Sequence, residues 1–226
     1  MKKKINEIIY LKNDIFTDKV IVKYRLKMVS IITDYLKNEE LFDVLDIGTT
    51  EDSSYESSNF LIKNLKFFKK FKSISDQKIE TSFFLNALNK SIVDNFTDLE
   101  LKEYQSDVVI SNATIEHVGS LENQIKMCEN IIKLSKKYFI ILTPNRYHPI
   151  DFHSKLPLIH WLPKKIHRYI LSLLGMRFLS DEKNLNLLSS NDLDFIMKKL
   201  NQKNYEIKSI NFLFFKSNLL LFSKKS

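Results

Sequence analysis

The sequence contains very few of the residues that usually mark sites or breaks in a chain. Its 226 residues include one cysteine, three glycines and four prolines. The single cysteine, Cys128, excludes an internal disulfide and a cysteine-based metal site. No apolar run is long enough to span a bilayer, and the run behind the basic N-terminus is too short for a signal peptide. We therefore expect a cytoplasmic protein.

Arginine is also scarce, although the chain is basic. The net charge is +8, yet only four of the 35 basic residues are arginines, which leaves 31 lysines spread along the sequence. A clustered positive charge would favour nucleic-acid binding, whereas scattered lysines are typical of a solvated surface. We expect no nucleic-acid partner. With 44% hydrophobic residues the chain can form a packed core, and its length fits one domain over residues 1–226.

Apolar segments alternate with helical patterns along most of the chain. We expect strands at 43–47, 71–75, 90–93, 107–112 and 138–143. Helices are predicted at about 15–37, 59–71, 121–132 and 189–201.

The last apolar segments, 205–215 and 218–225, are joined so tightly at Lys216–Ser217 that they must be antiparallel. The pattern predicts an α/β fold: a Rossmann-like, doubly wound sheet that is mostly parallel and has a C-terminal antiparallel strand.

The scarce residues gather in one segment after the fifth strand. All four prolines lie between 144 and 163, and four of the five histidines, three arginines and Trp161 lie between 146 and 177. This composition shift predicts a lid insertion at 144–180 rather than a second domain. Within it, 162–174 is a predicted helix with one apolar face. That face either packs on the sheet or rests on anionic lipid.

Polar residues follow the predicted strands at their carboxyl ends, where doubly wound sheets bind ligands. Asp46, Asp76 and Asp94 end the first three strands, and Asn112 and Thr143 end the fourth and fifth. Carboxylates in these places can accept hydrogen bonds from ribose hydroxyls or amino groups. Each aspartate alone could instead cap a helix, but the series favours a nucleoside site.

The shortage of glycine distinguishes between possible nucleoside cofactors. The stretch "VLDIGTTEDSSYESSN" (44–59) has only Gly48 where a dinucleotide fingerprint needs three glycines, and Asp76 lies 28 residues beyond it. A pyrophosphate would lack its close backbone approach. S-adenosylmethionine (SAM) carries no phosphate, so the sequence favours SAM over NAD.

The order of "VLDIGTT", "DVVISNATIEHVGSLENQ" and "ILTPNRYHPIDFHSKLPLIHWLP" resembles class I SAM-dependent methyltransferases over roughly residues 15–224. It is most similar to a bacterial branch associated with surface-polysaccharide or lipid-linked sugar biosynthesis. The resemblance implies SAM as cofactor and S-adenosylhomocysteine as product. It assigns the methionine part to Asp46, Gly48 and Thr49, the ribose to Asp76, the adenine to Asp94 and Asn95, and the sulfonium side to Asn112 and Ala113.

The acceptor side should lie near His117, just beyond the fourth strand. A hydroxyl acceptor benefits from a base, and His117 is the best-placed imidazole, although it could instead pack the loop. His148 on the lid is a second catalytic candidate. Arg146, His153 and Trp161 are expected to bind substrate, because guanidinium groups suit phosphates or carboxylates and an indole suits a sugar face.

We expect no metal, because the lid histidines 148, 153, 160 and 167 form no H-x-x-x-H pair and no E-x-x-H pair. The predicted function is O-methylation of a sugar or lipid-linked saccharide. The alternatives are a methyltransferase acting on a lipid or another small molecule, and a non-catalytic SAM or nucleoside-binding module. Contact with the inner face of a membrane through 162–174 is a further expectation.

Overall fold

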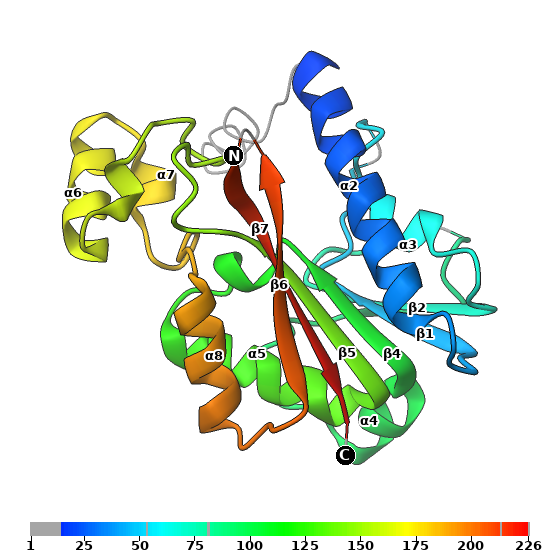
Figure 1. Cartoon of the computed structure of the whole chain (residues 1–226). Helices are drawn as coiled ribbons and strands as arrows, with labels where there is room; N and C mark the ends of the chain where they lie inside the picture. The colour runs from blue at the N-terminus through cyan, green and yellow to red at the C-terminus, as the bar shows by residue number, and fades with distance from the viewer. Residues whose placement is uncertain (1–14, 53, 81, 213, 226) are drawn as a thin grey trace.

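The computed structural model describes residues 15–225 except 53, 81 and 213, and is built around one seven-stranded sheet (Figure 1). The strand order is β3-β2-β1-β4-β5-β7-β6. The first five strands are parallel, and β7 is antiparallel to both β5 and β6. The predicted Rossmann-like mixed sheet is confirmed. The seven strands are β1 Asp43–Ile47, β2 Lys70–Ser75, β3 Asn86–Asn89, β4 Ser106–Asn112, β5 Ser135–Pro144, β6 Tyr205–Phe212 and β7 Phe215–Lys224.

Helices cover both faces of the sheet. On one face lie α2 Ile15–Leu36 and α3 Phe60–Asn64; on the other lie α4 Asp98–Tyr104, α5 Leu121–Leu134 and α8 Ser190–Lys199 (Figure 1). Successive strand residues point to opposite faces. In β1, Val44 therefore joins the core under α2 and α3, while Leu45 joins the core under α5 and α8. The strand order reverses between β1 and β4, which is where such sheets bind ligands.

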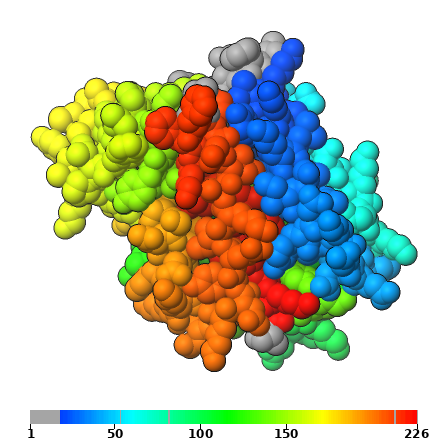
Figure 2. Space-filling model, in the orientation of Figure 1, coloured from blue at the N-terminus to red at the C-terminus, as the bar shows by residue number. Residues whose placement is uncertain are grey.

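The segment between β5 and α8 projects from the sheet as a separate lobe (Figures 1 and 2). It contains the short helix η2 Ile159–Trp161, then α6 Lys164–Leu173 and α7 Arg177–Ser180. Leu171, Leu179, Leu185 and Leu187 form a small core inside it. In the described ranges, no helix has both the length and the apolar character required to cross a bilayer.

Several predicted boundaries are wrong. The third strand is β3 at Asn86–Asn89, not 90–93. It is an edge strand whose residues alternate between half-buried and exposed, so it lacks an apolar run. The helix predicted at 59–71 ends at Asn64, because Leu65 leaves the helical conformation with ψ 66°, and Lys70 already pairs with Asp43 in the sheet. Helix α4 was not predicted, although Thr97 and Glu100 form a capping box at its start.

The C-terminal hairpin turns between Phe212 and Phe215, not at Lys216–Ser217. Ile210 pairs with Asn218 and Asn211 with Lys216, so Ser217 is the extra residue of a β-bulge. Its buried hydroxyl donates to the carbonyl of Ile210 at 2.9 Å. The polar pair that resembled a turn therefore marks this bulge.

Candidate functional site

The loop after β1 requires the glycine at position 48. Gly48 has φ +86°, and a Cβ at this position would overlap the side chain of Thr114. Thr114 belongs to the turn after β4, and its hydroxyl donates to the carbonyl of Ile47 at 3.2 Å. Gly48 thus lets the ends of β1 and β4 come together at the point where the strand order reverses.

Side-chain amides fix the conformation of the loop after β1. The Asn59 amide donates to the carbonyl of Thr50 at 2.7 Å, and its Oδ1 accepts from the Thr50 N–H at 3.0 Å. Asn59 itself adopts a left-handed conformation with φ 52°. Gln77 accepts from the Glu51 N–H at 3.0 Å. The loop is therefore fixed by the amide of Asn59, the N-cap residue of α3, and by the amide of Gln77 in the β2–β3 connection.

A cavity of about 210 Å³ lies beside this loop. It is lined by Thr50 and Glu51, by Asn59 and Lys63 near α3, and by residues of the β2–β3 connection. None of the residues predicted to contact a cofactor lines it.

Asp46 is the buried acid at the end of β1. Its Oδ2 accepts from the Thr49 hydroxyl at 2.5 Å, and that hydroxyl accepts from Ser73 at 2.7 Å. Burial raises the pKa of Asp46 to about 6, against the opposing effects of the Thr49 hydrogen bond and the charge of Arg25. A buried carboxylate with one hydroxyl partner is well suited to receive a further donor.

Arg25 of α2 connects the N-terminal helix to this loop. Its guanidinium donates to the carbonyl of Ser57, and the charges of Asp18 and Asp46 act on it. Burial lowers the pKa of Arg25, which these two carboxylates oppose. Asp18 also accepts from the Glu56 N–H at 3.1 Å. Helix α2 therefore holds the loop 48–59 over the end of β1.

The other predicted cofactor residues lie along the same edge of the sheet. Asp76 directly follows β2 and is exposed, while Asn112 ends β4, Ala113 directly follows it, and both are half-buried. Ala113 has φ 54°, and its N–H donates to the carbonyl of Leu142 at 2.9 Å. Because β1, β2 and β4 pair in parallel, their carboxyl ends meet at one edge. Asp94 and Asn95 are exposed and follow β3 after a short turn.

Glu116 and His117 lie beyond β4 in the short helix η1, Ile115–His117. Glu116 is completely buried, and its Oε2 accepts from the Thr143 hydroxyl at the end of β5, at 2.9 Å. Its Oε1 has no hydrogen-bond partner within the described residues and lies 3.9 Å from Nε2 of His117. Nδ1 of His117 donates to the carbonyl of Asn184 at 2.7 Å. This bond selects the tautomer that leaves a lone pair on Nε2.

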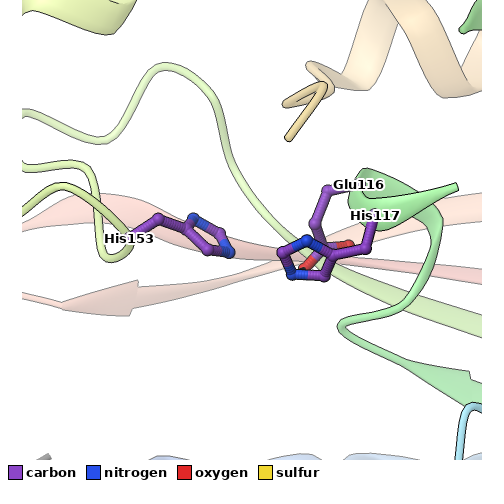
Figure 3. Close-up of side chains that lie close together, drawn as sticks. All are labelled: Glu116, His117 and His153. Atoms are coloured by element: carbon purple, nitrogen blue, oxygen red, sulfur yellow. Dashed lines mark ion pairs between the residues drawn. The ribbon is translucent and has the colours of Figure 1, made fainter. Parts of the chain in front are cut away.

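His153 approaches the same place from the lobe between β5 and α8 (Figure 3). Its ring centroid lies 5.1 Å from that of His117, with an angle of 72° between the planes. Nδ1 of His153 is 3.2 Å from Oδ1 of buried Asp151. Burial opposes protonation of His153, but the hydrogen bond and charge of Asp151 prevail and raise its pKa. Burial lowers the pKa of His117, although Glu116 acts in the opposite direction.

The other predicted residues of this segment make contacts elsewhere: Arg146 and Trp161 bond within the lobe, and the His148 ring also contacts Phe212 of β6 and Phe215 of β7. Arg146 donates to the carbonyls of His160 and Leu162 at 3.0 and 2.7 Å. Trp161 donates to the carbonyl of His148 at 3.2 Å, and the His148 ring stacks on Phe152 with centroids 4.7 Å apart. Across the part of the chain that the structure describes, no hydrogen bond, ion pair or ring contact joins Arg146, His148 or Trp161 to His117.

Sequence reasoning missed three side chains that organise this edge. Glu116 stands beside His117 in "IEHV", and Arg25 is the only arginine before position 146, which was an available signal. Asn186 gave none. It donates to the carbonyl of Gly119 at 2.7 Å and accepts from Lys164 of α6 at 2.7 Å, so it ties the lobe to the turn after η1.

The comparisons with known proteins identify the fold. Magnesium protoporphyrin IX methyltransferase from Synechocystis, solved with bound SAM, is similar with a TM-score of 0.55 and 11% identity, over 96% of this chain and 88% of that one. A Burkholderia thailandensis 1,6-didemethyltoxoflavin N1-methyltransferase, solved with its substrate and S-adenosylhomocysteine, gives 0.57 and 9%, over 94% and 81%. A SAM-dependent methyltransferase from Archaeoglobus fulgidus gives 0.51 and 16%, over 89% and 94%.

No family model matches the sequence, and no curated protein does either. The similar solved structures show that the chain has the fold of class I SAM-dependent methyltransferases, as the sequence resemblance predicts. The similarity is one of fold at low identity.

Proposed function

We propose that the protein is a SAM-dependent methyltransferase that acts on a small-molecule acceptor. The observation that carries this proposal is the group of polar side chains at the carboxyl ends of β1, β2 and β4, around the buried carboxyl of Asp46, on the methyltransferase fold. Two proteins with this fold were solved with SAM or S-adenosylhomocysteine bound. The single-glycine loop, which offers no close approach to a pyrophosphate, supports SAM over a dinucleotide.

In this proposal Asp46 receives the ammonium group of the methionine part, beside Gly48 and Thr49. Asp76 accepts hydrogen bonds from the ribose hydroxyls, because an exposed carboxylate directly after β2 lies at the edge of the site. Asp94 and Asn95 lie on the adenine side. Asn112 and Ala113 border the sulfonium, which directs the methyl group toward η1.

Methyl transfer requires a nucleophile in line with the carbon–sulfur bond. His117 lies four residues beyond Ala113 and is about one third exposed (35%). Its lowered pKa keeps the ring neutral near pH 7, so Nε2 can accept the proton of an acceptor hydroxyl. We assign the general-base role to His117 and an acceptor contact to His153. His148, which stacks on Phe152, is assigned a packing role instead of the catalytic one predicted for it.

For the acceptor, the finer proposal is a sugar or a lipid-linked saccharide. Helix α6 and the turn before it expose an apolar strip, which includes Trp161, Ile166 and Leu173. Exposed Lys165 lies in the same helix. An apolar strip with neighbouring cations fits peripheral contact with an anionic lipid surface, where a lipid-carried acceptor would be presented. The exposed indole of Trp161 can stack on a sugar ring. Arg146 stabilises the turn that carries Trp161 through its hydrogen bonds to the carbonyls of His160 and Leu162.

Transfer of a labelled methyl group from SAM to cell-envelope extracts tests this proposal. We expect a labelled product from the wild-type protein and at least about 100-fold slower transfer by His117→Ala, with SAM affinity near wild type. Binding of SAM without transfer to any acceptor fraction would support the non-catalytic binding module instead.

A further inference from the structure

We propose that Glu116, His117 and His153 bind a divalent transition-metal ion. One ligand atom from each of these three side chains lies within 4.8 Å of the others. Two imidazoles and one carboxylate form a common protein donor set for zinc and for non-haem iron. Figure 3 shows that the Glu116 carboxylate and the His117 ring extend from η1 toward the His153 ring, which comes from the lobe between β5 and α8.

Each of the three side chains has its other polar atom fixed by a second partner. Nδ1 of His117 donates to a backbone carbonyl, and Nδ1 of His153 faces a buried carboxylate, so both rings present Nε2 to the centre. The second oxygen of Glu116 accepts from Thr143. Metal-binding histidines characteristically donate their remaining N–H to a carbonyl or a carboxylate. The arrangement matches a preorganised ligand set.

The unpartnered oxygen of Glu116 is the second observation. Its Oε1 is buried, has no hydrogen-bond partner among the described residues and faces Nε2 of His117. Buried polar atoms in folded proteins nearly always have a partner, and a buried carboxylate oxygen without one is costly. A cation bound between this oxygen and the two imidazoles would supply the missing partner.

Small side-chain movements would complete the site. Oε1 of Glu116 and Nε2 of His117 are 3.9 Å apart, whereas adjacent ligand atoms around a tetrahedral zinc ion are about 3.4 Å apart, given metal–ligand bonds of about 2.1 Å. Two nitrogen donors favour zinc, iron, cobalt or manganese over magnesium, which prefers oxygen ligands. Three protein ligands leave at least one position open.

The ion would act on the acceptor, a role that rests on the proposed function. A hydroxyl oxygen of the acceptor would bind at the open position and lose its proton to solvent water, because a bound divalent cation lowers the hydroxyl pKa. That oxygen would then form a bond to the SAM methyl carbon. The carbon–sulfur bond would break with its electron pair on sulfur, which yields S-adenosylhomocysteine. With the ion bound, His117 would be a metal ligand in place of the general-base role assigned to it above, and the acceptor would be a hydroxyl compound.

The test measures metal binding in the absence of SAM and acceptor. Full-length protein stripped with EDTA is titrated with Co²⁺, and the visible absorption bands and the heat of binding are recorded. We expect one Co²⁺ per chain. His153→Ala should weaken binding by at least about tenfold, since loss of a second-shell partner alone has an effect of that size. The matched control is His167→Gln, which changes another lid histidine that lies outside the cluster.

Glu116→Gln provides a second variant, and thermal melting verifies that each variant is folded. Co²⁺ should raise the melting temperature of wild type and of His167→Gln but not of His153→Ala. No stoichiometric binding, binding that His153→Ala leaves unchanged, or equal affinity for Mg²⁺ and Co²⁺ would overturn the metal site. SAM calorimetry on the stripped protein separates the two proposals, because SAM binding without metal binding leaves the methyltransferase proposal intact.

Discussion

At the scale of single residues, the buried carboxyl of Asp46 makes stability depend on pH. Its pKa rises from 3.8 to about 6, so the folded protein binds a proton at pH values where the unfolded chain has released it. The stabilisation from this proton is fully present below pH 4 and is lost as pH rises through 6. A shift of this size corresponds to at most about 3 kcal/mol.

We therefore expect Asp46→Asn, which cannot ionise, to gain stability relative to wild type by about 1–3 kcal/mol between pH 4 and pH 7. Urea unfolding at a series of pH values measures this difference. The same variant should bind SAM more weakly, because the ammonium group loses its counter-ion. A stability difference that does not vary with pH would show that Asp46 has an ordinary pKa.

Gly48 and Gly175 form a matched pair of left-handed glycines. Both have positive φ, 86° and 78°, but a Cβ at 175 would meet nothing within 4 Å, whereas one at 48 would overlap Thr114. Gly175→Ala should cost about 1 kcal/mol of unfolding free energy from backbone strain alone. Gly48→Ala should cost about 2–4 kcal/mol, because steric overlap adds to the strain. Equal losses in denaturant unfolding would contradict the close packing of β1 against the turn after β4.

At the scale of elements, the buried central strands could be predicted from sequence, whereas the edge strand β3 could not. Strands β1, β4 and β5 are apolar because both of their faces are covered, and each was placed correctly. In the edge strand β3, half-buried residues alternate with exposed ones. The predicted strand therefore lies at 90–93 instead of Asn86–Asn89. The polar residues at Lys216–Ser217 predicted a turn because a buried serine in a bulge cannot be recognised without its partner strand.

Helix α6 is predicted to bind anionic lipid surfaces through its exposed apolar side chains. Ile166 and Leu173 are 47% and 69% exposed on a helix that also carries Lys165, a combination that favours anionic lipid surfaces. The double variant Ile166→Asp/Leu173→Asp should lose most binding to phosphatidylglycerol vesicles in co-sedimentation. Wild-type binding should weaken in high salt, because salt screens the lysine contribution.

The control for this experiment is Leu99→Asp in α4. Leu99 is 80% exposed but belongs to a different helix, which packs beside α5. It should leave vesicle binding unchanged. If wild type does not bind anionic vesicles, or if both variants lose binding equally, α6 has no specific membrane role.

At the scale of the whole molecule, the sheet topology was predictable and the convergence of side chains was not. Alternating strands and helices with a closing hairpin determine the strand order within a few alternatives. The contact of His153 with His117 depends on how the lobe after β5 folds back. The backbone carbonyl of Asn184 and the side chain of Asn186 join that lobe to His117 and to Gly119, and neither residue belongs to a recognisable sequence pattern. Arg25 donates to the carbonyl of Ser57, which lies 32 residues further along the chain. A contact over this separation cannot be predicted from local periodicity.

The central claim is that the edge of the sheet around Asp46 binds SAM. Calorimetry of the full-length protein with SAM, S-adenosylhomocysteine and NAD tests it most directly, with Asp76→Ala as the probe and exposed Asp34→Ala as the control. We predict binding of SAM and S-adenosylhomocysteine, no binding of NAD, and a loss of about 1–3 kcal/mol in Asp76→Ala only, because the ribose hydroxyls lose their acceptor. Binding of NAD with no binding of SAM would contradict the account.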